Sequence, residues 1–354
     1  MDMTRRGFIG SAAVAACGFA GRCAIAADAK GAGANGDGTI WAGLFHMGVN
    51  MWSDQPVDSW GPYKGEQLKL VCKSNRLRFD EKVWRSITGR MADVGMNMIV
   101  IDLGEAIKYP SHPELWVDGS WEIDRFRKEL DRLRAMGLEP IPKMNFSTAH
   151  DTWLNTYERM VSTKKYYQVC ADLIRDVAEI FDHPRFLHLG YDEETAGHQK
   201  KYAYCVVRQD DLWWHDFLWF VKETEKNGMR PWIWSDYVWH HPDLFYKRMP
   251  KSVLQSNWYY GGEFDVAKLG GSAANRVKAY EDLDKAGFDQ VPTGSNWSSD
   301  VNFSGTVAHC RRVCSPERLK GFLMAPWFFT LPEWEAKNIA AVDQVGACIR
   351  KQSL

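Results

Sequence analysis

The sequence of 354 residues lacks a surplus of charge of either sign, because 44 Lys and Arg side chains stand against 45 Asp and Glu side chains. A nucleic-acid-binding protein usually carries a basic surplus, so we expect no nucleic acid as a partner. After residue 30, no run reaches the roughly 18 uncharged apolar residues that a membrane-spanning helix needs. The chain is nevertheless 45% hydrophobic, which excludes a disordered protein.

Cysteine is sparse and shows no metal-binding pattern. Cys310 and Cys314 are spaced i, i+4, but no second pair has ligand spacing, so packing is their expected role. The patterns His-x-His and His-Glu-x-x-His are absent as well. His46 and His188 fall at early strand positions, where a hydrogen-bonded core histidine is the expected role. We therefore expect no metal and no cofactor.

The N-terminus has the three parts of a bacterial export signal. Residues 4–10, Thr-Arg-Arg-Gly-Phe-Ile-Gly, resemble the twin-arginine signal, and a short apolar stretch and the Ala-Ile-Ala site at 24–26 follow. We expect residues 1–26 to be removed, residues 27–38 to be a flexible linker, and the mature protein to be periplasmic or secreted. One alternative remains open, because residues 14–17, Val-Ala-Ala-Cys, fit a lipoprotein cleavage site. Lipidation of Cys17 would anchor the protein to a membrane.

From residue 39 to residue 354, short β-rich runs alternate with amphipathic stretches. The expected strands are 44–51, 97–103, 138–145, 186–192, 231–237, 253–259, 290–296 and 321–327. The expected helices are roughly 80–95, 122–136, 165–181, 211–227, 242–248, 273–286, 306–318 and 334–350. Eight strand-then-helix units predict a single (β/α)8 TIM barrel. A doubly wound open sheet is the alternative, and it is disfavoured because no Gly-rich phosphate loop follows the first strand.

The expected strand ends collect aromatic and polar residues. In a TIM barrel the active site lies at these ends. The chain has 17 Trp, and six of them lie at or just after the ends of five different expected strands: Trp52, Trp234, Trp239, Trp258, Trp297 and Trp327. Sugar rings have apolar C–H faces and polar rims, so aromatic walls with carboxylate and amide partners suit a carbohydrate. The sequence therefore predicts a carbohydrate substrate bound in an aromatic cup.

The clearest chemical signal is the run Asp192-Glu193-Glu194, which directly follows an apolar strand. Glycosidic cleavage needs an acid for the leaving oxygen and a negative or nucleophilic group for the oxocarbenium-like centre. Neighbouring carboxylates raise each other's proton affinity, so one of them can stay protonated near neutral pH. We predict Asp192 and Glu193 as the catalytic pair.

Three segments resemble the family 20 glycoside hydrolases, the β-N-acetylhexosaminidases. Residues 188–193, His-Leu-Gly-Tyr-Asp-Glu, are similar to the family's H-x-G-G-D-E strand. Pro-Ile-Pro at 140–142 followed by His150 is similar to its third strand and the next loop. Residues 217–236, which end in Trp-Ile-Trp-Ser-Asp, are similar to its fourth helix and fifth strand. A looser match of Trp positions extends to Trp327.

The resemblance implies a retaining, substrate-assisted mechanism in which the 2-acetamido oxygen of the substrate attacks the anomeric carbon. Glu193 would be the general acid and then the base, and Asp192 would orient the acetamido group. Trp234, Trp258 and Trp327 would wall the pocket, and Tyr259 would donate a hydrogen bond to the acetamido oxygen. The other expected substrate-binding residues are His150, Asp236, Trp297, Asn145 and Tyr191.

The chain also departs from the family pattern. Tyr191 stands where the family has Gly and is expected to narrow the site. Lys143 and Asn145 stand where it has acidic residues. The first strand lacks the family's sugar-binding Arg, and Glu333 is the nearest substitute for the Glu that follows its last strand. The family's usual N-terminal α/β domain has no counterpart in these residues.

Three other readings of the site remain open. In a two-carboxylate glycosidase, Glu193 would be the acid, and Glu105, Asp236 or Glu263 the nucleophile. In a metal-dependent isomerase or lyase, Asp102, Glu193, Asp236 and a His would bind the metal. In a non-catalytic sugar-binding barrel, only the aromatic cup would matter.

Overall fold

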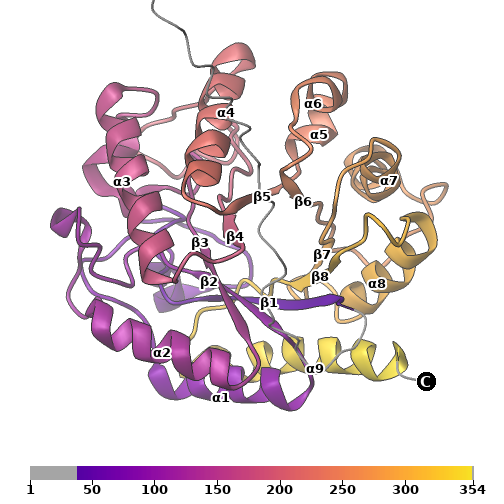
Figure 1. Ribbon diagram of the computed structural model, residues 1–354, viewed down its shortest axis with the longest axis horizontal. Coiled ribbons are helices and arrows are strands. Elements are labelled where there is room, and N and C mark those ends of the chain that lie inside the picture. The colour runs from indigo at the N-terminus through magenta and orange to yellow at the C-terminus, as the bar shows by residue number, and fades with distance from the viewer. Residues whose placement is uncertain (1–37, 353–354) are drawn as a thin grey trace, which may run out of the picture. The chain divides into compact units, whose positions relative to one another are not determined.

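The computed structural model describes residues 38–352. The predicted export signal, Cys17 and nearly all of the predicted linker lie outside these residues. The described part of the chain forms the expected (β/α)8 barrel, in which parallel strands are surrounded by helices (Figure 1). No helix among the described residues has the length and apolar character to cross a membrane.

Each strand of the barrel pairs in parallel with its neighbours, in the order β6-β5-β4-β3-β2-β1-β8-β7. The strands are β1 Ile40–His46, β2 Met98–Asp102, β3 Glu139–Lys143, β4 Phe186–His188, β5 Arg230–Trp234, β6 Leu254–Ser256, β7 Thr293–Gly294 and β8 Gly321–Met324. The α-helices are α1 Glu81–Asp93, α2 Ile123–Ala135, α3 Lys164–Ile180, α4 Asp210–Lys226, α5 Tyr237–His240, α6 Pro242–Arg248, α7 Gly271–Lys285, α8 Asn302–Val313 and α9 Glu335–Gln352. Short 3-10 helices are η1 Gly65–Leu70, η2 Pro113–Leu115, η3 Thr152–Arg159 and η4 Pro332–Trp334.

The barrel closes between β6 and β7 through single bridges instead of a regular ladder. Gln255 bridges Gln290, and Trp258 bridges Thr293. The Val291 amide donates to the Gln255 carbonyl at 2.9 Å, and the Thr293 amide donates to the Asn257 carbonyl at 2.9 Å. These bonds join the two ends of the strand order and complete the ring.

The first strand begins four residues earlier than the sequence analysis expects, at Ile40 instead of Leu44. Its ladder ends at His46, because the amides of Met47 and Gly48 both turn to the Asp102 carbonyl, at 2.9 and 3.1 Å. A Cβ on Gly48 would lie 2.1 Å from the Leu103 carbonyl oxygen, so only glycine fits this turn. Residues 47–51 therefore belong to the loop above the barrel.

The first and third helices start at capping side chains. Asp80 accepts hydrogen bonds from the amides of Lys82 and Val83, and Thr163 accepts one from Tyr166, as N-cap residues do. In a parallel barrel each helix begins near the carboxyl end of the preceding strand. The loops between those two points, which are long after β1, β3 and β4, carry the candidate site.

Candidate active site

The chain leaves β4 through a strained turn that carries the predicted catalytic pair. Gly190, Tyr191 and Glu193 have φ values of 71°, 74° and 57°, in the left-handed region. Non-glycine residues are uncommon there, and such strain concentrates at functional sites. The turn takes Asp192 and Glu193 out of the alternation of a regular strand, so that both carboxylates reach the same imidazole.

That imidazole belongs to His150, on the loop after β3. Its Nε2 lies 3.4 Å from Asp192 Oδ2 and 3.3 Å from Glu193 Oε2. Burial opposes protonation of the ring, but the charge of Asp192 and the contacts with both carboxylates outweigh it and raise the pKa of His150 to about 10. Burial also opposes ionisation of Glu193, yet the contact with His150 lowers the pKa of that carboxyl. The His150 imidazole therefore stands between the carboxylates of Asp192 and Glu193 and is held in its protonated form by them.

Asp236, just beyond β5, joins this group from the other side. Its Oδ2 accepts a hydrogen bond from the Glu193 amide at 2.9 Å, which supports the left-handed backbone of Glu193. Its Oδ1 is buried and has no hydrogen-bond partner among the described residues. Burial and then the charge of Asp192 raise the pKa of Asp236 to about 8. We call Asp192, Glu193 and Asp236 the carboxylate cluster.

Two further basic side chains approach Glu193 from the loop that follows it. His198 Nε2 lies 3.3 Å from Glu193 Oε1. The ammonium of Lys201 lies 3.0 Å from the centroid of the Trp60 ring, and burial lowers the pKa of Lys201 to about 8 even though Glu193 opposes that shift. Glu193 thus has imidazoles on both sides and a lysine within electrostatic range.

An aromatic wall stands beside the carboxylate cluster, formed by Trp234, Trp258, Tyr260 and Trp327. The rings of Trp234 and Trp327 are 5.7 Å apart, and Trp258 stacks on Tyr260 at 5.1 Å. The indole of Trp327 donates to the Tyr260 hydroxyl at 2.9 Å and joins the two pairs. Trp327 also has a left-handed φ of 63°. The structure therefore brings together three of the predicted aromatic residues, Trp234, Trp258 and Trp327.

The prediction for Tyr259 is corrected by the structure. Its ring packs edge-on against Phe264 at 5.3 Å, while the neighbouring Tyr260 faces the wall. After burial, the charges of Asp192 and Glu193 contribute to the raised pKa of Tyr260, so its hydroxyl is in electrostatic range of both carboxylates. In extended backbone, residues i and i+2 point the same way. Trp258 and Tyr260 therefore share a face, and Tyr259 points away.

Asn145 supports the floor of the site instead of lining the cup, which corrects a second prediction. Its Nδ2 donates to Asp102 Oδ1 at 2.8 Å, and its Oδ1 accepts from Lys143. Lys143 Nζ and His46 Nδ1 bind Asp102 Oδ2 at 3.0 and 3.1 Å. All four side chains are at most 1% exposed. They form a buried polar network inside the barrel, and both ends of the Asn145 amide are used within it.

Tyr191 is the third correction. Its ring packs against Trp213 and Phe217 of α4, each at 5.2 Å, and under the guanidinium of Arg208 at 4.5 Å. The left-handed turn thus directs Tyr191 into the layer between barrel and helix, and it does not narrow the cup. Arg208 is buried as well, and it binds Glu194 and Asp216. Glu194 is therefore bound to a cation of its own, away from the carboxylate cluster.

Trp297 lies in a second aromatic cluster outside the wall. Its ring contacts Phe328 at 5.2 Å and Tyr63 at 5.9 Å. The Tyr63 hydroxyl donates to the Trp327 carbonyl at 3.1 Å, so this cluster braces the backbone of a wall residue. Its other members include Trp52, Phe329 and Trp334, and Trp60 packs on its edge. The structure gives no contact between Trp297 and the carboxylate cluster.

Of the three alternative nucleophiles, only Asp236 lies beside Glu193. Glu105 is buried below the loop after β1, where its carboxylate accepts from the amides of Val49 and Asn50, each at 3.0 Å. Glu263 is on the surface and accepts from the amides of Phe264 and Asp265 in its own loop. Both have structural roles in the loops that hold them.

One group among the described residues has the geometry to hold a metal ion. His150, Asp192 and Glu193 each offer a ligand atom, and these atoms lie within 4.8 Å of one another. The set that the sequence indicates for a metal enzyme is not brought together, because Asp102 is held by Lys143 and Asn145 below the cup.

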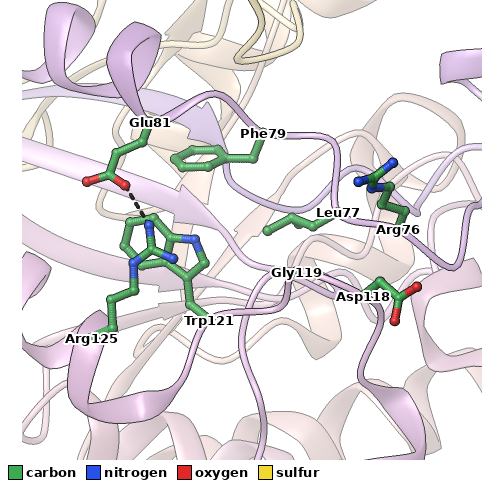
Figure 2. A pocket seen from close by; sticks show the side chains of 8 residues that line it. All are labelled: Arg76, Leu77, Phe79, Glu81, Asp118, Gly119, Trp121 and Arg125. Carbon is green, nitrogen blue, oxygen red and sulfur yellow. Dashed lines mark hydrogen bonds and ion pairs between the residues drawn. The ribbon is translucent and has the colours of Figure 1, made fainter.

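A cavity of about 320 Å³ opens at the start of α1 and α2, away from the predicted site residues (Figure 2). Its charged walls are partly paired, since Arg125 binds Glu81 at 2.5 Å and stacks on Trp121 at 3.7 Å. The rest of its lining is Arg76, Leu77, Phe79, Asp118 and Gly119. The cavity shares no residue with the carboxylate cluster or the aromatic wall.

Tyr260, His198 and Lys201 belong to the site but are not among the predicted site residues. Alternation from Trp258 would have selected Tyr260. His198 and Lys201 lie in an irregular loop, where no periodicity indicates which side chains turn back toward Glu193. Such loops are held by hydrogen bonds between distant segments, here from the Tyr202 hydroxyl to the Met51 carbonyl at 2.9 Å.

Comparisons with known proteins give a match of structure only. No known protein-family model matches the chain, and no curated protein matches it in sequence. The fold is similar to β-N-acetylhexosaminidase from Bacteroides fragilis, with a TM-score of 0.55 and 11% identity over 86% of this chain. It is similar to a mutant β-hexosaminidase from Streptomyces plicatus in complex with GlcNAc, with a TM-score of 0.55 and 12% identity over 86% of this chain.

The chain spans 65% of the length of the Bacteroides protein and 63% of the Streptomyces protein. It spans 83% of a structure of the pneumococcal virulence factor StrH, with a TM-score of 0.52 and 12% identity over 88% of this chain. At this identity the likeness is one of fold. The sequence motifs resemble those of the family 20 β-N-acetylhexosaminidases, and the barrel has the same fold as those enzymes. The two observations therefore agree.

Proposed function

We propose that this protein is an exported, retaining glycoside hydrolase that acts on β-linked N-acetylhexosamine sugars. Glu193 is the general acid and then the base, and Asp192 orients the acetamido group. The observation that carries the proposal is the carboxylate cluster, which stands at the carboxyl end of β4 next to the aromatic wall. The structures with a similar fold include β-hexosaminidases, one of them in complex with GlcNAc.

Free hydrogen-bonding atoms support the acetamido part of the proposal. Asp192 Oδ1 is buried and has no hydrogen-bond partner among the described residues, so it is available to accept from an acetamido N–H. The Tyr260 hydroxyl accepts from Trp327, so its own hydrogen is available to an acetamido oxygen.

His150 supplies the proton in this scheme. With a pKa of about 10 its imidazole is protonated at neutral pH, and it lies 3.3 Å from Glu193 Oε2. The proton passes through Glu193 to the leaving oxygen as the acetamido oxygen attacks the anomeric carbon. Glu193, then ionised, accepts a proton from the water that opens the cyclic intermediate. Acid and base are thus the same carboxyl in two successive steps.

A substrate screen and one variant test the proposal. The protein lacking residues 1–26 is assayed on aryl N-acetyl-β-glucosaminide, N-acetyl-β-galactosaminide and the aryl glucoside that lacks the acetamido group. We expect turnover of the acetamido sugars only, and a fall in kcat of about two to four powers of ten in Glu193→Gln with sugar binding retained. Glu263→Gln, which removes an exposed carboxylate outside the site, is the matched control.

Turnover confined to sugars without an acetamido group would contradict the substrate-assisted mechanism. It would favour the second candidate, a two-carboxylate glycosidase in which Asp236 is the nucleophile, because Asp236 alone of the alternatives lies beside Glu193. Sugar binding with no turnover in the wild type, unchanged in Glu193→Gln, would instead indicate a non-catalytic carbohydrate-binding barrel.

A further inference from the structure

Lys201 places a positive charge within electrostatic range of the carboxylate cluster and has no anion bound to it. Its side chain is half-buried, and its ammonium lies 3.0 Å from the centroid of the Trp60 ring. Among the described residues, the ammonium forms no ion pair and donates no hydrogen bond, although the charge of Glu193 acts on it through space. An ammonium taken partly out of water without a counter-ion is costly. Lys201 is therefore a group with which an anion from outside the protein can pair.

Hydrogen bonds of the backbone hold Lys201 in this position. Its carbonyl accepts from the Ser53 hydroxyl at 2.8 Å, and the hydroxyl of Tyr202 donates to the Met51 carbonyl at 2.9 Å. These bonds join the loop after β4 to the loop after β1, which also carries Trp60. The ammonium is therefore kept beside the ring by two loops that are bound to each other, so it can serve as a specific binding group.

The leaving group of the substrate extends from the side of Glu193 that is open to solvent. Under the proposed function, Glu193 protonates the leaving oxygen, so the rest of the substrate begins at this carboxyl. Its Oε2 faces the His150 side chain, which is 12% exposed, and its Oε1 faces the His198 side chain, which is 48% exposed. Lys201 follows His198 in the same loop and acts on the same carboxyl. The leaving group would therefore lie on the side of His198 and Lys201.

A series of ring contacts connects Trp60 to the aromatic wall. The Trp60 ring lies 5.9 Å from that of Trp52, which lies 5.4 Å from the His46 ring, and the His46 ring lies 5.7 Å from that of Trp327. Trp327 belongs to the wall against which the acetamido sugar would be held. Trp60 and Lys201 therefore lie beyond that sugar, where the next unit of the substrate would be placed.

We propose that Lys201 binds a carboxylate on the leaving group, so that the preferred substrate is an acetamido sugar β-linked to an acidic sugar. The inference rests on the proposed function, because it takes Glu193 as the acid that protonates the leaving oxygen. The carboxylate would supply the counter-ion that the ammonium lacks. Because the ammonium is already partly removed from water, this pair would be stronger than one between two exposed side chains.

The charges already present leave room for such an anion. His150 is protonated, with a pKa of about 10, and its imidazole lies between Asp192 and Glu193. Asp236, with a pKa of about 8, is largely protonated at neutral pH. The negative charge of Asp192 and Glu193 is therefore balanced in part by His150, and the charge of Lys201 is left for the substrate.

Binding of the carboxylate would also favour the acid form of Glu193. The charge of Lys201 is one of the influences that lower the pKa of Glu193. A carboxylate paired with Lys201 offsets that charge, so the Glu193 carboxyl holds its proton more strongly once the substrate is bound. An acidic leaving group would therefore aid the proton transfer as well as the binding.

Aryl glycosides that differ in the charge of the leaving group test the inference. The full-length chain is assayed on carboxyphenyl N-acetyl-β-glucosaminide and on the neutral carbamoylphenyl compound, and the ratio of the two kcat/KM values is taken. Lys201→Met is expected to lower this ratio by about tenfold or more, because it removes a charged partner. Lys200→Met, which removes the exposed neighbouring lysine, is the matched control and should leave the ratio within about twofold.

Binding to Glu193→Gln separates this inference from the proposed function. Calorimetry measures the dissociation constants of a disaccharide in which N-acetylglucosamine is β-linked to glucuronate, and of its methyl ester. We expect the acid to bind about tenfold more tightly than the ester, and Lys201→Met in the same background to abolish the difference. Equal affinities for acid and ester, or no binding of either, would overturn the inference even if acetamido sugars are hydrolysed. A preference for the acid that depends on Lys201, in a wild type that hydrolyses none of these compounds, would support the anion site and overturn the proposed hydrolysis alone.

Discussion

At the scale of the residue, Tyr260 connects the aromatic wall to the carboxylate cluster. It stacks on Trp258, accepts from the indole of Trp327, and lies in the electrostatic range of Asp192 and Glu193. Its neighbour Tyr259 packs on Phe264. Tyr259 and Tyr260 therefore have the same side chain but point in different directions, so substitutions at the two positions can be compared directly.

We expect Tyr260→Phe to lower kcat/KM on an acetamido substrate by about ten- to a hundredfold, since it removes one hydrogen bond to a developing charge. Tyr259→Phe should change kcat/KM by less than about twofold. Steady-state assays of both variants measure the difference. Equal losses in the two variants would contradict the assignment of the donor to Tyr260.

Asp236 makes stability depend on pH in a direction that can be worked out. An aspartate titrates near 3.9 in the unfolded chain and near 8 in the folded protein. Because the folded pKa is raised, its contribution to the free energy of unfolding is fully present below about pH 4 and is lost as pH rises through 8. Asp236→Asn cannot ionise, so its stability relative to the wild type should improve by at least about 1 kcal/mol between pH 5 and pH 9.

Urea unfolding of the wild type and Asp236→Asn at both pH values measures this difference. A stability difference that does not change between the two pH values would contradict the raised pKa of Asp236. Glu263→Gln, from the surface, is the control and should give a constant difference.

The residue scale also shows what the sequence could and could not predict. Asp192, Glu193 and Asp236 follow apolar strands directly, so their place at the catalytic face follows from the barrel pattern. Asn145 and Tyr191 also lie at strand ends, but their directions depend on other segments. Asn145 is drawn to Asp102 and Lys143, and Tyr191 follows a left-handed turn that a non-glycine residue rarely adopts.

At the scale of the element, the loop from β4 to α4 is fastened by one buried guanidinium. Arg208 binds Glu194 in the loop and Asp216 in α4, and it donates to the Phe146 carbonyl at 2.8 Å on the neighbouring loop. It also covers the ring of Tyr191. Arg208, at the α4 end of this loop, therefore stabilises the loop backbone that carries Glu193 near its β4 end.

Arg208→Met should cost about 3–5 kcal/mol of unfolding free energy, because it leaves two buried carboxylates without their cation. Arg185→Met, which breaks an exposed pair with Glu139, should cost at most about 1 kcal/mol. Chemical denaturation of both variants measures the contrast. Similar costs for the two would mean that Arg208 does not carry the loop.

At the scale of the whole barrel, seven neighbouring strand pairs form ladders, the shortest of them the single register pair of β3 and β4, whereas β6 and β7 are joined by isolated bridges. The seam between β6 and β7 has single bridges only, and β7 itself is two residues long. The alternation of strands and helices predicted the number of units and their order. It could not predict the weak closure, because two strands with equal apolar patterns can differ in how many backbone bonds they share.

Hydrogen exchange should reveal this seam. The amides of Val291 and Thr293, which bridge it, are expected to exchange at least about tenfold faster than the amides of β2, since local opening requires fewer bonds to break. Mass spectrometry of exchanged peptides, or NMR, measures the two rates. Equal protection of β2 and the seam would contradict the expectation.

The polar network inside the barrel has a consequence for how related sequences vary. Asp102 is bound by Lys143, His46 and Asn145, all of them buried. Loss of Lys143 alone would strand a carboxylate in the core, and loss of Asp102 alone would strand an ammonium. Neither single change is a tolerable intermediate. Positions 102 and 143 should therefore be inherited as a pair across homologues, both charged or both neutral, so that the floor of the barrel evolves as one unit.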